Sequence, residues 1–260
     1  MNRGTTTAGG TMPLKKINII GIPVSPAHSH ELHAGISEII GSGRPGVVLS
    51  GNVHGLNLAY KLAWLKEFYQ RADIVRVDGA GIVWAAGILG SKIPSRLTWA
   101  DWGWLFAEYV ASRGYSLFLL GGPQNTAELT AALFRKRNPG IKIVGTHHGY
   151  FQKQGVENEA LIQEINDLRP DILVVGMGMP LQEQWILSNS ANINAKVIIT
   201  CGAAFEYLSG TKKRCPEWMG RLGFEWLYRF SQEPRRMAKR YIWGNIIFML
   251  RILRQHFQEN

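Results

Sequence analysis

Short apolar runs alternate with amphipathic segments along most of this chain. We expect strands at Ile17–Ile22, Val47–Ser50, Ile74–Val77, Leu117–Leu120, Lys142–Gly145, Ile172–Val175 and Val197–Thr200. We expect helices at Ser29–Ile40, Gly55–Gln70, Ala80–Leu89, Trp102–Ser112, Thr126–Asn138, Glu157–Leu168 and Gln182–Ser188. Val- and Ile-rich strands that alternate with helices predict an α/β fold: a mostly parallel sheet with helices on both faces.

After about Gly210 the pattern changes. The segment from Lys212 to Phe257 has eleven Lys or Arg against three Glu, interleaved with Trp, Tyr and Phe. Such a helical, basic and amphipathic appendage is typical of a protein that works at an anionic membrane surface. Its most apolar part, Ile242–Leu253, is interrupted by Gly244, Asn245 and Arg251 and is shorter than the roughly 20 apolar residues that span a bilayer.

Other interpretations of this segment stay open. It could be a solvated basic helix that packs its aromatic residues on the core, with Glu225 and Arg229 as an i,i+4 pair. Basic and aromatic residues also suit single-stranded nucleic acid, but the aliphatic residues from Ile246 to Leu253 suit lipid or a partner helix better. We therefore expect no nucleic-acid partner, and a homo-oligomer is an alternative use of an exposed apolar helix.

Charge is localised in the same segment. The chain of 260 residues carries a net charge of +10, of which Lys212–Phe257 contributes +8. The core is nearly neutral, so the positive charge points to a phosphate-bearing partner: lipid headgroups, nucleic acid or a pyrophosphate substrate.

The chain length fits one core with an appendage. We predict a disordered N-terminus at 1–14, a catalytic core at 15–210 and a membrane-associating appendage at 211–260. The Gly/Thr-rich start has no apolar run of the signal-peptide kind. Cys201 and Cys215 imply no disulfide framework.

Small or polar residues follow five of the predicted strands. They are Ser50-Gly51-Asn52, Asp78-Gly79, Gly121-Gly122-Pro123, Gly176-Met177-Gly178-Met179-Pro180 and Cys201-Gly202-Ala203. Ligands of open α/β sheets bind at the carboxyl ends of the strands, so we expect these loops to converge on one site. Glycines and helix N-termini there would let a phosphate approach backbone N–H groups.

Asp78 is the carboxylate that stands out at a strand end. One interpretation is a helix N-cap, which aspartate makes well. The other is a general base held in a cleft. The sequence alone does not decide between them.

Several familiar kinds of site are absent from the sequence. The glycine loops lack the spacing of a dinucleotide fold and of a P-loop. There is no Gly-x-Ser-x-Gly motif, and neither cysteine has a histidine nearby in sequence, which argues against a covalent hydrolase. No Asp-x-Asp pair could clamp a Mg²⁺–diphosphate, and the histidines at 28, 30, 33, 147 and 148 lack a metal-ligand pattern, so we expect no metal site.

Taken in order, these motifs resemble the WecG/TagA/CpsF family of bacterial glycosyltransferases over about Ile17 to Met249. The segments that carry the resemblance are 77–83 (Val-Asp-Gly-Ala-Gly-Ile-Val), Leu119–Gly122, His148–Phe151, Gly176–Glu183, Gly223–Phe230 and Glu233–Arg236.

The resemblance implies a Rossmann-like core and an inverting, metal-independent transfer. The donor would be a UDP-sugar, typically of the N-acetylmannosamine type, and the acceptor an undecaprenyl-diphosphate-linked sugar used in cell-surface polysaccharide. The protein would be peripheral, on the cytoplasmic face of the bacterial membrane, with the appendage closing over the active site. A non-catalytic nucleotide-sugar-binding or membrane scaffold module is the alternative function.

The resemblance also assigns residues. Asp78 matches the proposed base, Asn52 and Ser50 match a Thr-x-Asn site beside it, and Arg214 matches an arginine that would stabilise the departing diphosphate. From the glycine loops at the strand ends we expect substrate contacts by Gly121, Gly122, Gly176 and Gly178, and from the resemblance contacts by Arg96, Asp101, Gln182, Glu183 and Glu206. Gln182-Glu183 also opens a helix, where a first-turn glutamate complements the helix dipole.

Four departures from the family pattern weaken any assignment of the donor as N-acetylmannosamine. Ser50 replaces Thr, and Glu206 stands where Asp is frequent. Trp99-Ala100-Asp101-Trp102 replaces the commoner Gly-x-Asp-Leu, and His54 lies in the helix after Asn52. Other hexoses are therefore open as donors.

Overall fold

A computed structural model describes residues 14–259, apart from the side chains of Arg221, Arg236, Met237, Lys239 and Arg240. The segment predicted to be disordered, 1–14, lies outside the described residues except for Leu14.

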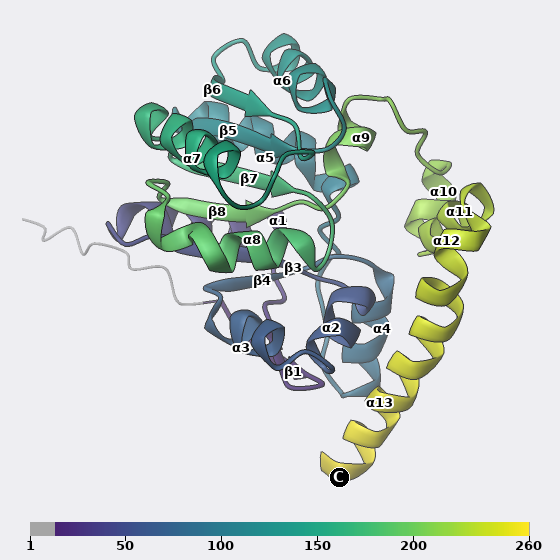
Figure 1. Ribbon diagram of the computed structural model, residues 1–260. Coiled ribbons are helices and arrows are strands. Elements are labelled where there is room, and N and C mark those ends of the chain that lie inside the picture. The colour runs from purple at the N-terminus through teal and green to yellow at the C-terminus, as the bar shows by residue number, and fades with distance from the viewer. Residues whose placement is uncertain (1–13, 260) are drawn as a thin grey trace, which may run out of the picture.

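A six-stranded, fully parallel sheet forms the centre of the molecule (Figure 1). The strands lie in the order β4-β3-β8-β7-β5-β6. Their bounds are β3 Gly46–Gly51, β4 Ile74–Val77, β5 Ser116–Gly121, β6 Lys142–His147, β7 Ile172–Gly176 and β8 Val197–Thr200. The predicted α/β class and parallel sheet are confirmed.

Helices cover both faces of this sheet. One face packs against α1 Ser29–Gly41, α5 Trp99–Arg113, α6 Thr126–Arg137 and α9 Ala204–Leu208. The other packs against α2 Val53–Ala59, α3 Ala63–Arg71, α4 Ala80–Ile88, α7 Val156–Leu168 and α8 Leu181–Asn189, which a 3₁₀ turn, η1 Ser190–Asn192, follows. Because side chains alternate along a strand, Leu173 and Val175 of β7 enter one core and Ile172 and Val174 enter the other.

The first predicted strand is instead an antiparallel hairpin, β1 Ile17–Ile19 and β2 Ile22–Val24, outside the main sheet. Ile20 and Gly21 form its turn, both at positive φ (46° and 85°). Two-residue hairpin turns favour this conformation because it matches the strand twist. Gly21 is the residue of the predicted strand Ile17–Ile22 that indicates a turn.

The helix predicted at Gly55–Gln70 is two helices, α2 and α3, separated at Leu62, whose backbone is extended (φ −111°, ψ 104°). No glycine or proline marks the break. The end of α2 is instead held from outside: Arg251 donates to Asn57 Oδ1 at 2.6 Å and lies over the Tyr60 ring at 3.9 Å. A residue far away in the sequence, Arg251, thus contacts the end of α2 next to the break between the two helices.

The segment after Gly210 is helical and runs along one side of the layered core (Figure 1). It comprises α10 Glu217–Arg221, α11 Glu225–Gln232, α12 Pro234–Ala238, a π-helical turn η2 Lys239–Trp243, and α13 Gly244–Glu259. Phe248 and Ile252 of α13 are buried in the core that α2 and α4 also line. No helix within residues 14–259 has both the length and the apolar composition needed to cross a bilayer.

Candidate active site

A cavity of about 560 Å³ opens at the carboxyl ends of the strands, between the core and the C-terminal helices. Loops that follow β3, β4, β7 and β8 form its core side. Residues of α11, η2 and α13 form the opposite side. Four of the five predicted loops therefore meet here; Gly121 and Gly122, which end and follow β5, do not line this cavity.

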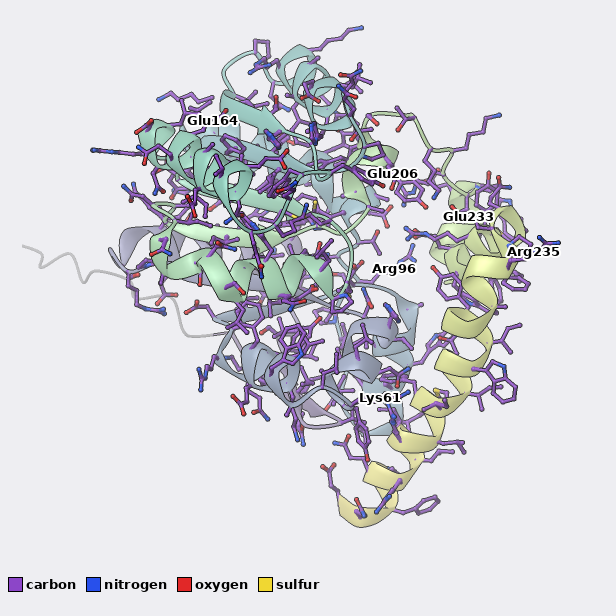
Figure 2. The ribbon with its side chains drawn as sticks, in the orientation of Figure 1. Lys61, Arg96, Glu164, Glu206, Glu233 and Arg235 are labelled. Carbon is purple, nitrogen blue, oxygen red and sulfur yellow. The ribbon has the colours of Figure 1, made fainter. Side chains whose placement is uncertain are left out.

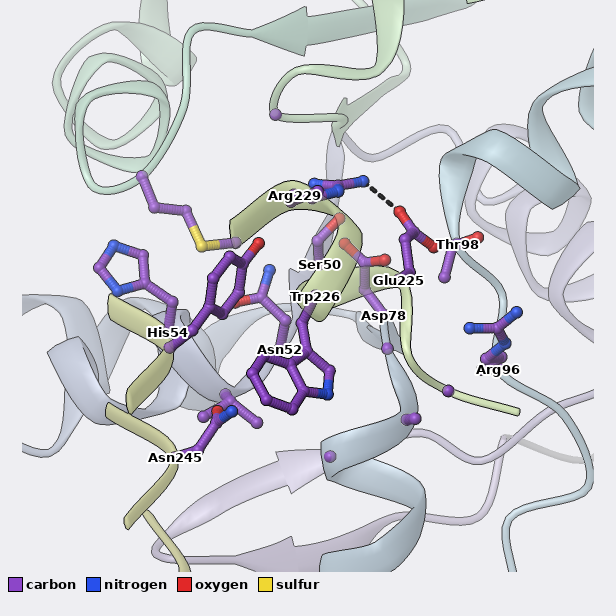
Figure 3. Close-up of a pocket in the computed structure, with 18 of the residues that line it drawn as sticks. Ser50, Asn52, His54, Asp78, Arg96, Thr98, Glu225, Trp226, Arg229 and Asn245 are labelled. Atoms are coloured by element: carbon purple, nitrogen blue, oxygen red, sulfur yellow. Dashed lines mark hydrogen bonds and ion pairs between the residues drawn. The ribbon is translucent and has the colours of Figure 1, made fainter. Parts of the chain in front are cut away.

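Asp78 lies at the centre of the cavity lining (Figure 3). It follows β4 directly, and its backbone N–H donates to Gly51 O at 2.9 Å, which ties the two strand ends together. The N-cap of α4 is Gly79, and no side chain caps that helix. Asp78 is therefore not a helix cap, and its side chain, 25% exposed, faces the site.

Ser50 and Asn52 line the cavity beside Asp78 (Figure 3). The Ser50 hydroxyl donates to Thr200 O at 3.1 Å, and the Ser50 N–H donates to Thr200 Oγ1 at 2.8 Å. Asn52 is the N-cap of α2, with Oδ1 accepting from Gly55 N–H at 2.9 Å. Both side chains are thus fixed by the backbone of neighbouring elements.

Arg96 lines the cavity, whereas Asp101, with which it pairs, does not. Its guanidinium is 3.5 Å from Asp101, which also pairs with Arg214. Arg214 donates to Ala100 O at 3.0 Å as well, so it fastens the segment after α9 to the start of α5. Burial alone would raise the pKa of Asp101, but hydrogen bonds from Arg214 and Thr98 and the nearby arginine charges outweigh it and lower that pKa.

The predicted glycines differ in what surrounds them. A Cβ on Gly121 or Gly176 would overlap neighbouring backbone, and one on Gly122 would overlap the Thr126 side chain, so these three glycines serve close packing. At Gly79, Gly178 and Gly202, all at positive φ, a Cβ would meet nothing within 4 Å, and all three line the cavity. Open backbone of this kind suits a phosphate.

Gln182 and Glu183 lie beneath the site, fully buried at the start of α8. Gln182 Oε1 accepts from Gly202 N–H at 3.0 Å, and Gln182 Nε2 donates to Glu183 Oε1 at 2.7 Å. Burial raises the pKa of Glu183 to about 7, against the smaller lowering effect of the hydrogen bond from Gln182. These two residues support the Gly202 loop and do not line the cavity.

Glu206 of α9 also stays outside the cavity lining. Figure 2 shows Glu206 and Arg96 on the side of the core that faces the C-terminal helices, with Glu233 on those helices. The structure thus brings together Asp78, Asn52, Ser50, Arg96 and Gly178 in the cavity lining, and leaves the remaining predicted residues outside it. Their predicted substrate contacts stay predictions.

Arg229 of α11 is the main lining residue that the predicted site lacked. It pairs with Glu225 and lies 4.6 Å over the Tyr207 ring, and both of these partners also line the cavity (Figure 3). Burial alone would lower the pKa of Arg229, but the charge of Glu225 outweighs it and raises that pKa. The sequence showed the i,i+4 pair, but it could not show that the pair faces the strand ends.

Two donors of α11 stand out. Among the described residues, the buried Trp226 Nε1 and Arg229 Nε have no hydrogen-bond acceptor. Both side chains belong to the cavity lining. Buried donors without partners are costly, so an anionic ligand that supplied acceptors here would offset that cost.

Metal ligands do not gather at this site. Within the part of the chain that the structure describes, no three His, Cys, Asp or Glu side chains lie together as a possible metal site. What the cavity offers is the carboxylate of Asp78, the ion pair of Glu225 and Arg229, the guanidinium of Arg96 and open glycine backbone, an arrangement suited to an anionic substrate next to a base.

Comparisons with known proteins agree on one family. The sequence model of the glycosyl transferase WecG/TagA/CpsF family matches residues 17–260. Curated relatives include proteins of Staphylococcus aureus named N-acetylglucosaminyldiphosphoundecaprenol N-acetyl-beta-D-mannosaminyltransferase. The protein of strain MRSA252 is 28% identical over 192 residues, 74% of each chain. Those of strains MW2 and NCTC 8325 are 27% identical over the same share.

Proposed function

Because the chain belongs to the WecG/TagA/CpsF glycosyltransferase family, we propose that it moves a hexose or N-acetylhexosamine from a UDP-sugar onto a polyprenyl-diphosphate-linked sugar. It is a glycosyltransferase, and the product serves cell-surface polysaccharide synthesis. The finer proposal is a single displacement with inversion, in which Asp78 is the general base.

The position of Asp78 carries this proposal. It is a cavity-facing carboxylate at a strand end that caps no helix. In an inverting transfer, the base takes the proton of the acceptor hydroxyl as that oxygen attacks the anomeric carbon, and UDP leaves from the opposite side of the sugar. Ser50 and Asn52 line the cavity beside Asp78, and we assign to them the orientation of the reacting sugars.

The departing diphosphate needs positive charge or N–H donors. Arg229 and Arg96 line the cavity, and Gly178 exposes backbone to it, whereas the Gly202 N–H is already donated to Gln182 Oε1. Preorganised donors of this kind stabilise charge that develops in the transition state, in the way a metal ion would. We assign this work to Arg229 in preference to Arg214, because Arg229 lines the cavity and its Nε has no acceptor among the described residues, whereas Arg214 does not line the cavity.

The acceptor's lipid matches an apolar surface on the C-terminal helices. Trp243, Ile246, Leu250, Leu253 and Phe257 are all exposed and follow the spacing of one helix face. Ile246 also lines the cavity, so this face adjoins the site. We propose that it lies in the headgroup region of an anionic membrane, which makes the protein peripheral on the cytoplasmic face.

A transfer assay tests this function. The full chain is incubated with a panel of UDP-hexoses and UDP-N-acetylhexosamines and a short-chain polyprenyl-diphosphate–N-acetylglucosamine, with and without EDTA. We expect one donor to give a disaccharide product of inverted anomeric configuration, in EDTA as well, read by mass spectrometry and NMR. A retained configuration or an absolute need for Mg²⁺ would contradict the proposed mechanism. UDP binding without turnover of any donor would favour the non-catalytic binding module.

A further inference from the structure

A fully buried arginine lies directly under Asp78. Arg76 is the third residue of β4, and its side chain is 0% exposed. The guanidinium carbon lies 5.6 Å from the centre of the Trp99 ring and 5.2 Å from that of Trp102. Both rings belong to α5, which covers this face of the sheet.

The geometry of strand β4 places Arg76 on the same face of the sheet as Asp78, next to Ser50. Alternation places Ile74, Arg76 and Asp78 on one face of the sheet, and Arg76 stands directly opposite Ser50 in the β3–β4 register. Arg76 Nη2 donates to Ser50 Oγ at 2.5 Å and lies 3.9 Å from Asp78 Oδ2. One guanidinium nitrogen thus reaches both Ser50 and Asp78.

The rest of this guanidinium is poorly satisfied. Arg76 Nε and Nη1 are buried and have no hydrogen-bond acceptor among the described residues. A buried charge with unmade hydrogen bonds is weak support for folding stability, and apolar replacements of buried ion pairs are often neutral or stabilising. A stability role therefore explains Arg76 poorly, whereas its two polar contacts both lead to the site.

The tryptophans complete this arrangement. Trp99 Nε1 donates to Thr200 O at 2.8 Å, the same carbonyl that accepts the Ser50 hydroxyl. The Trp99-Ala100-Asp101-Trp102 sequence, which departs from the commoner Gly-x-Asp-Leu, thereby acquires a role: its two rings cover the Arg76 guanidinium.

We propose that Arg76 is a positioning residue that fixes the Asp78 carboxylate and the Ser50 hydroxyl at the floor of the active site. This inference rests on the proposed role of Asp78 as the base. Arg76 does not line the cavity, so it acts through these two side chains and contacts no substrate. Its loss should slow the chemical step and leave UDP binding unchanged.

Two variants of Arg76 and one matched control test this. Arg76→Met removes the charge and the donor, and Arg76→Lys keeps a charge. Arg137→Met removes another arginine that lies over a tryptophan, 5.1 Å from the Trp104 ring, at the far end of α6. The measurements are kcat, KM for the UDP-sugar, the Kd for UDP and the thermal midpoint.

We expect Arg76→Met to lower kcat about 100-fold with the UDP Kd within about twofold of the parent protein, a loss of the size seen when a positioned catalytic group is disturbed. Arg76→Lys should recover about tenfold of that loss, and Arg137→Met should change neither quantity. In the Arg76→Met background, Ser50→Ala should cost little more, because the two residues act as a unit.

Three results would overturn the proposal: a folded Arg76→Met with near-parental kcat, a parallel loss of kcat and UDP binding, or an Arg76→Lys variant no better than Arg76→Met. If Arg76→Met does not fold, Arg76→Lys decides, and an unchanged kcat in Arg76→Lys overturns the proposal.

A crystal structure of the variant tests the same proposal without a measurement of turnover. The side chains of Asp78 and Ser50 should shift or adopt two conformers, and unchanged positions of both side chains would refute the proposal. Absence of transfer by the parent protein would instead refute the proposed function.

Discussion

At the scale of single residues, two carboxylates near the site have different environments. Asp78 faces the cavity, whereas Glu183 is fully buried with its Oε2 atom unpaired among the described residues. Asp78 is therefore the carboxylate that can meet substrate. The Glu183 carboxyl holds Gln182, which in turn holds the Gly202 loop.

Glu183 makes stability depend on pH. Its pKa rises from 4.5 in the unfolded chain to about 7 in the fold, so the folded state binds the proton more tightly. This group therefore favours folding most below pH 4.5, and the advantage is lost as pH rises through 7. Glu183→Gln should remove a pH-dependent loss on the order of 3 kcal/mol, since one pKa unit corresponds to about 1.4 kcal/mol.

Urea denaturation of the parent and Glu183→Gln proteins at pH 5 and pH 8 measures this difference. The free energy of unfolding of the variant minus that of the parent protein should be larger at pH 8 than at pH 5. An equal difference at both pH values would show that Glu183 does not titrate in this range.

Substitutions of two arginines of the C-terminal segment, Arg229 and Arg214, should also differ in their effect on kcat. Arg229 lines the cavity, whereas Arg214 pairs with Asp101 outside the cavity lining. We expect Arg229→Ala to lower kcat about 100-fold or more, as loss of one transition-state donor does, and Arg214→Ala to lower it less than tenfold. Steady-state kinetics on both variants decide, and the reverse order would restore the original assignment of Arg214.

At the scale of elements, the apolar pattern located the parallel strands and the main helices but missed two boundaries. Runs such as Ile172–Val175 are apolar on both faces, which only a sheet covered on both sides explains. The break between α2 and α3 coincides with contacts from Arg251, almost 200 residues away, and no local pattern encodes such a contact.

Helix α13 has two apolar faces, and substitutions on them should have different effects: on stability for the buried face and on membrane binding for the exposed face. Phe248 and Ile252 are buried in the core, whereas Leu250 and Leu253 are exposed. Phe248→Ala should lower the free energy of unfolding by about 3–5 kcal/mol because it leaves a cavity. Leu250→Asp with Leu253→Asp should leave stability nearly unchanged but reduce binding to anionic vesicles.

Thermal melts and vesicle sedimentation separate the two effects. If the double aspartate variant sediments with vesicles as well as the parent does, the exposed face of α13 is not the membrane contact. A change of oligomeric state in that variant would assign the face to a second copy of the chain.

At the scale of the whole molecule, the site is assembled from two parts of the chain. The motifs at strand ends predicted Asp78 and Asn52 on the core side of the cavity, and the family resemblance added Arg96. They could not predict the opposite side, because Trp226, Arg229, Tyr241 and Asn245 reach the site only through the path that the C-terminal helices take across the core. Local sequence showed Trp226, Arg229 and Tyr241 as aromatic or basic and showed the pair of Arg229 with Glu225, but the position of these residues at the cavity became visible only in the fold.

Removal of the chain from Lys212 onward tests this division. It would delete one whole side of the cavity and most of the net positive charge. We expect the shortened chain to lose vesicle binding and to lose transfer activity even toward a water-soluble, short-chain acceptor. Retained activity toward that acceptor would show that the core alone completes the site.

The substitution Asp78→Asn separates a base of glycosyl transfer from a carboxylate that only lines the cavity. Asp78→Asn keeps the size of the side chain and removes its ability to accept a proton. If Asp78 is the base, kcat for transfer from the UDP-sugar to the polyprenyl-diphosphate-linked acceptor falls by about 10² to 10⁴, with UDP affinity and thermal midpoint unchanged. Full activity of Asp78→Asn would contradict the assignment of Asp78 as the base.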